Sequence, residues 1–184
     1  TASEGHLLMY GRKDASERRW HNADHVEAVL KEKWGLMLPP LLRVDNLAHI
    51  PMTVQAALFH AAQVVLMVEG GGSANLFFCR PGTITIEVGC WSGPSWPMFG
   101  VVRDALRIRH TLVQNPLTDC LLNGKHPTDN QQAHKVSSFN MSDTAVACVA
   151  NTLMLNGSAA GSCERLFVDP LRFSTYGGGS TQVM

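Results

Sequence analysis

The chain lacks the features that mark several common classes of protein. No run of about 18 apolar residues occurs, because residues 56–68 are interrupted by His60 and Gln63, so no membrane-spanning helix is expected. Fifteen basic and fifteen acidic residues give a formal net charge of +0, which leaves no positive excess for nucleic acid or an anionic membrane surface. We therefore expect neither partner.

Metal and cofactor signatures are also missing. The five cysteines contain no C-x-x-C pair, which disfavours a structural zinc site. His21 and His25 are four residues apart, but no third ligand stands nearby, and capping or surface histidines are the alternative. The glycines do not follow G-x-G-x-x-G, so a cytosolic Rossmann-type redox enzyme is disfavoured. We expect neither a metal nor another cofactor.

What remains is the pattern of an α/β protein. The length of 184 residues suits one domain, with a core at about 7–113. Apolar runs alternate with helical periodicity. Strands are predicted at 7–10, 41–44, 64–68, 83–88 and 108–113, and helices at 26–34, 53–61 with Thr53 as cap, 98–106 and 143–155. This alternation of strands and helices predicts a mostly parallel, Rossmann-like sheet with helices on both faces.

Residues 114–141 turn polar between the predicted sheet and the last helix. A loop of that length in a compact domain is usually functional or disordered, so we expect little regular structure there.

The most informative stretch is residues 64–88, in which two apolar runs flank a triple glycine. Gly70, Gly71 and Gly72 allow close approach of the backbone to a ligand. Residues 73–78 can open a short helix whose N–H groups and dipole attract phosphate. The alternative is a tight strand-to-helix turn without a ligand.

These residues resemble the glycosyltransferase 61 family. The stretch EGGGSANLFF at 69–78, with RPG at 80–82 and ITIEV at 84–88, is similar to that family's pattern of His-Gly-Ala-Gly-Leu-Thr-Asn, a Phe, Pro-Gly and a strand ending in Glu. Further upstream and downstream features agree: Arg12, RRWHN at 18–22, Gln55 and ALRIR at 105–109. The resemblance covers about residues 7–113.

The resemblance implies a transferase that moves a sugar from a UDP-type nucleotide sugar to a glycan or glycoprotein acceptor, with inversion and no obligatory metal. It also implies two Rossmann-like domains facing across a cleft, the GT-B arrangement. This chain matches only the C-terminal, donor-binding half. We therefore expect a fragment of a larger protein, with the general base and acceptor side supplied by a missing N-terminal domain or partner subunit.

Candidate site residues follow from the topology. Ligands of open parallel sheets bind beyond the carboxyl ends of the strands, where Gly11-Arg12, Asp45-Asn46, Glu69-Gly70 and Gly89-Cys90 should converge. Without a metal, arginines and a helix N-terminus must stabilise a diphosphate leaving group. Arg12 and Arg19 are the candidates, and solvated surface arginines are the alternative.

Polar side chains around the glycines complete the predicted donor site. Ser73 and Asn75 can donate to phosphate, or Asn75 can brace the turn instead. Glu87 ends a buried strand and can accept ribose hydroxyls, or else reach solvent or pair with an arginine.

Glu69 departs from the family pattern, which commonly has His at this place. A carboxylate repels phosphate unless it is protonated or binds sugar hydroxyls. Two interpretations stay open. Glu69 contacts the sugar as a possible catalytic residue, or the chain is a non-catalytic α/β binding or structural module of a larger assembly.

Two sequons, at Asn140 and Asn156, would be glycosylated only in a secretory compartment, which suggests the Golgi or ER lumen. An oxidising lumen would also permit a disulfide such as Cys120–Cys163. Alternatively, Asn140 or Ser142 caps the last helix.

Overall fold

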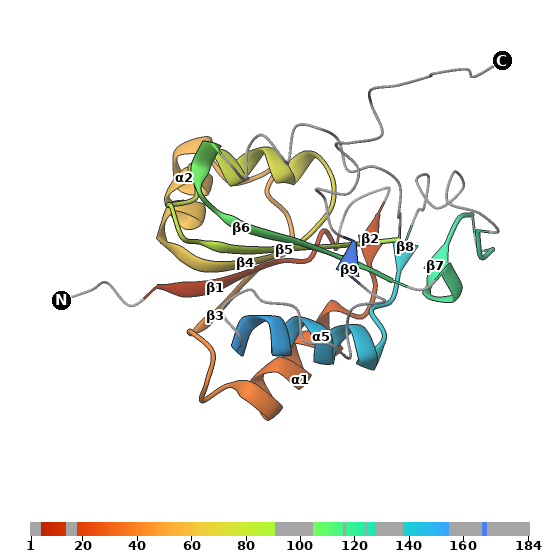
Figure 1. Ribbon diagram of the computed structural model, residues 1–184. Helices are drawn as coiled ribbons and strands as arrows, with labels where there is room; N and C mark the ends of the chain where they lie inside the picture. The colour runs from red at the N-terminus through yellow and green to blue at the C-terminus, as the bar shows by residue number, and fades with distance from the viewer. Residues whose placement is uncertain are drawn as a thin grey trace, which may run out of the picture.

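The computed structural model describes residues 5–13, 18–90, 105–115, 117–123, 125–127, 138–154 and 167–168. Within these ranges, six strands form a central sheet in the order β3-β1-β4-β5-β6-β9 (Figure 1). Five of them are parallel to their neighbours, and β9 runs antiparallel to β6. The strands are β1 (His6–Tyr10), β3 (Leu41–Val44), β4 (Ala62–Val68), β5 (Ile84–Gly89), β6 (Arg109–Gln114) and β9 (Phe167–Val168). This sheet confirms the predicted α/β, Rossmann-like fold class.

Helices cover both faces of the sheet, as predicted (Figure 1). On one face lie α1 (Ala23–Trp34) and α5 (Asp143–Met154), and on the other lie α2 (Met52–Ala61) and the 3-10 helix η1 (Gly71–Phe78). Alternate residues of β1 point to opposite faces of the sheet. Leu7 packs with α1 and α5, whereas Leu8 packs with α2 and η1. Both side chains are fully buried, which explains why the strand is apolar from Leu7 onward.

The start of α2 differs from the prediction. Thr53 was expected to cap this helix, but the helix begins at Met52 and the cap is Pro51, whose carbonyl accepts bonds from the amides of Val54 and Gln55. A proline already has a φ suited to helix entry, so it replaces the hydroxyl cap. The helix predicted at 98–106 lies outside the described residues except for its last turn at 105–106.

A second, smaller sheet lies beyond the carboxyl ends of β4 and β5 (Figure 1). It consists of β2 (Arg19–Trp20), β8 (Ser138–Phe139) and β7 (Cys120–Leu121), which follows a 3-10 turn, η2 (Leu117–Asp119). The prediction of little regular structure over residues 114–141 is thus corrected at two short strands and a 3-10 turn. These strands are too short for periodicity to detect, and the pairing of β2 with β8 joins segments far apart in the sequence.

Side chains join the small sheet to the helices. The amide of Asn22 donates to Met141 O at 2.8 Å and its Oδ1 accepts from Met141 N at 2.8 Å. The ring of Trp20 stacks on Phe139 with centroids 6.1 Å apart and donates to Asn22 Oδ1. Ser142 caps α5 by accepting from Ala145 N, which confirms that one of the two predicted caps is used.

A disulfide between Cys90 and Cys120 ties the small sheet to the end of β5. The expected Cys120–Cys163 bridge is wrong, because Cys120 is already bonded to Cys90, whose Cα lies 6.0 Å away. Cys79 is a buried free thiol among the described residues. In the part of the chain that the structure describes, every helix is too short or too polar to cross a bilayer.

Candidate functional site

The carboxyl ends of the parallel strands meet along one edge of the sheet. Gly11 N donates to Val44 O at 3.0 Å, Glu69 N to Val88 O at 3.1 Å and Asn115 N to Gly89 O at 2.7 Å. These bonds align the segments that follow β1, β4, β5 and β6 side by side. The predicted convergence of these strand ends is confirmed.

Two arginines stand over the turn that follows β4. Arg12 Nη1 donates to Glu69 O at 3.3 Å, and Arg18 Nη1 lies 3.9 Å from Glu69 Oε1. A Cβ on Gly70 would lie 1.9 Å from Arg12 Nη1, and Gly70 has φ +147°. Only glycine therefore allows the Arg12 guanidinium to cross the turn at this point.

Arg18, rather than the predicted Arg19, joins this cluster. Arg19 is exposed in β2, where it pairs with Ser138 of β8. Arg18 lies just before β2 in the left-handed region, with φ 54°, whereas Arg19 is the first residue of the strand. The Arg18-Arg19 doublet signals a cationic segment, but the sequence alone does not tell which arginine faces inward.

The glycine turn leads directly into η1. Ser73 N donates to Gly70 O at 2.9 Å, which is the first bond of the 3-10 ladder. The amides of Gly71 and Gly72 therefore precede the ladder, as the first amides of any helix do. Among the described residues, a Cβ on Gly71 would meet nothing within 4 Å, whereas one on Gly72 would lie 2.5 Å from Tyr10 Cε1. Gly71 is also exposed.

Asn75 braces this turn from within. Its Nδ2 donates to Gln55 Oε1 at 3.1 Å and to Gly72 O at 3.2 Å, and the residue is 7% exposed. Gln55 Nε2 in turn donates to Leu47 O and Ile50 O. The bracing role considered for Asn75 is therefore the one that its contacts describe.

Glu87 lies deep beneath the same turn, at 1% exposed. It accepts a hydrogen bond from Ser73 Oγ, and its Oε2 lies 3.2 Å from His110 Nε2. His110 Nδ1 is 2.8 Å from Thr85 Oγ1 on the neighbouring strand. The carboxylate thus neither reaches solvent nor pairs with an arginine in these contacts, and it positions Ser73 at the start of η1.

Glu69 is buried between the arginines and Glu87. Burial, followed by the charge of Glu87, raises the pKa of Glu69 to about 7, while Arg18 and Arg12 act in the opposite direction. The carboxyl is therefore partly protonated near neutral pH. This reduces the repulsion that an acid at this position would otherwise exert on a phosphate.

Asp45 and Asn46 form local hydrogen bonds at the same edge of the sheet. Asp45 Oδ1 accepts from Arg43 Nε at 2.7 Å, and Asn46 Oδ1 accepts from Ala48 N at 2.8 Å. A Cβ on Gly11 would lie 2.6 Å from Asp45 Oδ1, so glycine is needed there as well. We assign neither polar side chain to a ligand.

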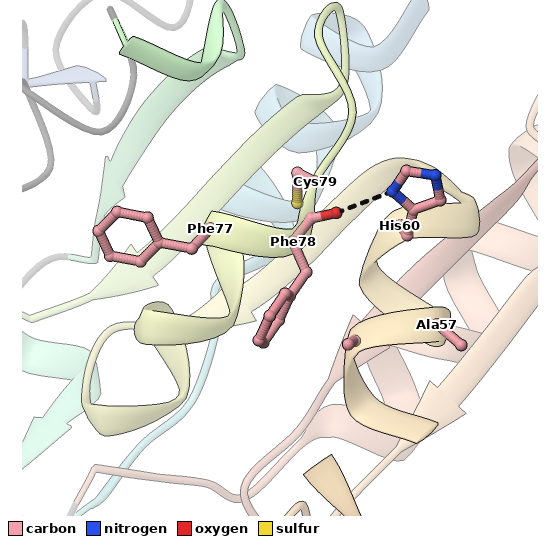
Figure 2. Close-up of a pocket in the computed structure, with 6 residues that line it drawn as sticks. Ala57, His60, Phe77, Phe78 and Cys79 are labelled. Carbon is pink, nitrogen blue, oxygen red and sulfur yellow. Dashed lines mark hydrogen bonds between the residues drawn. The ribbon is translucent and has the colours of Figure 1, made fainter. Parts of the chain in front are cut away.

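An apolar cavity of about 460 Å³ lies between α2 and η1 (Figure 2). It is lined by Ala56, Ala57, His60, Phe77, Phe78 and Cys79. His60 Nδ1 lies 3.3 Å from Phe78 O. Burial raises the pKa of the Cys79 thiol to about 12, so the thiol is unreactive. The lining comes from the ends of α2 and η1 that lead toward the amino ends of β4 and β5, so this cavity is distinct from the glycine turn.

The remaining sequence candidates lie elsewhere. His25 Nε2 contacts Asp143 Oδ1 at 3.1 Å on the surface, and His21 is exposed. Among the described residues, no group of three or more His, Cys, Asp or Glu side chains could hold a metal. Asn140 is exposed next to α5, and Asn156 lies outside the described residues.

A parallel Rossmann-like sheet with arginines over a glycine turn at its carboxyl edge defines the chain as an α/β domain, the class of fold in which ligands generally bind at that edge. The family model of glycosyltransferase 61 matches residues 3–86, which include β1, the glycine turn and the first part of β5. The predicted resemblance is thus confirmed over this segment, and it supports a glycosyltransferase function in general. No curated protein matches the chain.

Proposed function

We propose that this chain is the donor-binding half of a glycosyltransferase that uses a nucleotide diphosphate sugar of the UDP type. The observation that carries the proposal is the position of Arg12 Nη1 across Gly70, with Arg18 beside it and the exposed Gly71 next along the chain. Guanidinium groups and amides at the start of a helix are the donors that bind a diphosphate without a metal.

The charge of the cluster favours an anion. Arg12 and Arg18 carry two positive charges against the carboxyl of Glu69, whose pKa of about 7 leaves it partly neutral at physiological pH. Glu87 adds a negative charge, but it lies beneath the turn at 1% exposed, where it contacts Ser73 and His110. A diphosphate entering in front of Gly71 would therefore meet donors and a positive potential.

The chemistry assigned to this half is stabilisation of the leaving group. When the bond between the anomeric carbon and the diphosphate breaks, negative charge grows on the phosphate oxygens, and arginines already in place stabilise it. We propose that the acceptor, a glycan or glycoprotein, and the general base belong to an N-terminal domain or partner in a GT-B arrangement. The proposal includes no obligatory metal, and it places the protein in the Golgi or ER lumen.

Glu69 is assigned to the sugar rather than to the phosphates. Its protonated carboxyl can donate a hydrogen bond and its ionised form can accept from hydroxyl groups. Arg12 and Arg18 hold it beside the turn, where the sugar of a donor with its diphosphate at Gly71 would lie.

The test is calorimetric titration of the full chain with UDP. We expect binding that weakens about 10- to 100-fold in Arg12→Ala and less in Arg18→Ala, as loss of a charge-assisted hydrogen bond predicts. Arg80→Ala is the matched control, since Arg80 contacts Ala61 O near the amino end of β4. Arg19→Ala should also bind normally. Absence of binding at millimolar UDP, or equal binding by Arg12→Ala, would overturn the proposal.

The second candidate function is a non-catalytic module of a larger assembly. It is favoured by Glu69 and by the bond from Gly70 N to Ser73 Oγ at 3.3 Å, which occupies one amide of the turn from within. This candidate predicts that UDP and inorganic pyrophosphate both fail to bind the chain, whereas the donor-binding proposal requires at least the diphosphate to bind.

A further inference from the structure

Asn115, directly after β6, is fully buried at 0% exposed. Within the described part of the chain, neither its Nδ2 nor its Oδ1 has a hydrogen-bond partner. Buried carboxamides normally form hydrogen bonds. Without a partner, the free-energy cost of removing the amide from water is not compensated. A chain under selection for stability alone would carry an apolar side chain here.

The side-chain amide of Asn115 lies at the same edge of the sheet as the proposed donor site. Asn115 N donates to Gly89 O at 2.7 Å, so the residue is fixed at the same carboxyl edge as Glu69 and Arg12. The strand order β1-β4-β5-β6 puts it two strands from Glu69 and three from Arg12. At about 4.8 Å per step, these separations are roughly 10 and 14 Å.

The edge therefore has a cationic end and a neutral polar end. Arg12 and Arg18 stand at the first, and Asn115 with its unused donor and acceptor stands at the second. A nucleoside diphosphate has the same division, with charged phosphates at one end and a neutral base at the other. A carboxamide matches a base edge that presents an acceptor beside an N–H, as uracil does.

We propose that Asn115 hydrogen-bonds the nucleobase of the donor nucleotide, an inference that rests on the proposed function. Its Nδ2 donates to a ring carbonyl, and its Oδ1 accepts from the neighbouring ring N–H. Because the amide is covered in the unliganded chain, the base must displace what covers it, and association is slower than for a preformed site.

The test compares UDP with inorganic pyrophosphate in titrations of the full chain. Wild type binds UDP more tightly than pyrophosphate, because only UDP carries a base. Asn115→Leu removes both polar atoms at similar size. This variant should lower the affinity for UDP about tenfold and leave the affinity for pyrophosphate unchanged. It should also raise the midpoint of thermal unfolding, because a buried amide without hydrogen-bond partners is removed.

Two further variants sharpen the result. Asn115→Asp keeps the size but offers only acceptors when ionised, so it should shift preference from UDP toward CDP, whose cytosine amino group donates. Asn140→Leu, at an exposed asparagine, is the control and should change neither affinity.

The outcomes separate the two claims. If pyrophosphate binds and Asn115→Leu leaves the UDP-to-pyrophosphate ratio at the wild-type value, the base contact is overturned while the donor site stands. If neither UDP nor pyrophosphate binds the wild-type chain, both the donor site and the base contact are overturned.

Discussion

Glu69 and Glu87 are buried at the carboxyl ends of neighbouring parallel strands, and the charge of Glu87 helps to raise the pKa of Glu69 to about 7. Donors surround the pair, with Ser73 and His110 on Glu87 and Arg18 near Glu69. Two acids so close together with arginines form a site whose charge changes within the physiological pH range.

Replacing Glu69 with Gln should make the stability of the chain less dependent on pH. Because the folded pKa of Glu69 lies above its ordinary 4.5, its stabilising contribution is complete below about pH 4.5 and is lost as the pH rises through 7. Between pH 5 and pH 8, wild type should lose about 2–3 kcal/mol relative to Glu69→Gln in urea unfolding. The control is Glu32→Gln on the exposed side of α1. Parallel pH curves for wild type and Glu69→Gln would contradict the assignment.

Alanine at Gly70 and alanine at Gly71 should behave very differently. At Gly70 the backbone has φ +147° and a Cβ would overlap Arg12 Nη1, so Gly70→Ala should cost about 1–3 kcal/mol and displace the arginine. At Gly71 a Cβ meets no atom of the described residues within 4 Å, so Gly71→Ala should stay within about 0.5 kcal/mol of wild type. Thermal unfolding measures both. Equal losses would show that the turn has another conformation.

The Gln55–Asn75 hydrogen bond should appear as a coupling energy. Truncating either residue to Ala leaves a buried partner unsatisfied and should cost about 1–3 kcal/mol. The double variant should lose less than the two single losses together, by about 0.5–2 kcal/mol. Thr53→Ala, an exposed position two residues before Gln55, tests the corrected cap and should change stability by less than about 0.5 kcal/mol. Additive losses for Gln55 and Asn75 would argue against the brace.

The Cys90–Cys120 disulfide should be detectable by peptide mapping without reduction. It joins residues 30 apart, and closing a loop of that length stabilises a fold by about 3–4 kcal/mol in the chain-entropy account. The double variant Cys90→Ala/Cys120→Ala should therefore unfold about 10 °C lower. A double variant is preferable to a reducing agent, because Cys148 is also disulfide-bonded. A mapped peptide joining Cys120 to any other cysteine would refute the pairing.

Much of the central fold could be predicted from the sequence because its signals are local. A strand buried on both faces needs an unbroken apolar run, and residues 64–68 provide one. The turn at Gly70 needs a residue that tolerates positive φ, and three glycines are visible in the chain. Both features depend on nothing outside their own segment.

The details that sequence missed depend on contacts between distant segments. Whether Arg18 or Arg19 faces Glu69 is decided by the pairing of β2 with β8, more than 100 residues later. The partner of Cys120 is likewise set by where β5 ends. The orphaned amide of Asn115 becomes visible only when its burial and its neighbours are known together.

Arg12 and Arg18 both occupy the left-handed region, with φ of 49° and 54°, where residues other than glycine are strained by about 1–2 kcal/mol each. Glycine at either place would relax the main chain while deleting a guanidinium. Laboratory evolution that rewards only heat resistance should therefore drift toward glycine or asparagine at these two positions. The selected variants would be more thermostable, but they would lack positive charge at the carboxyl edge of the sheet.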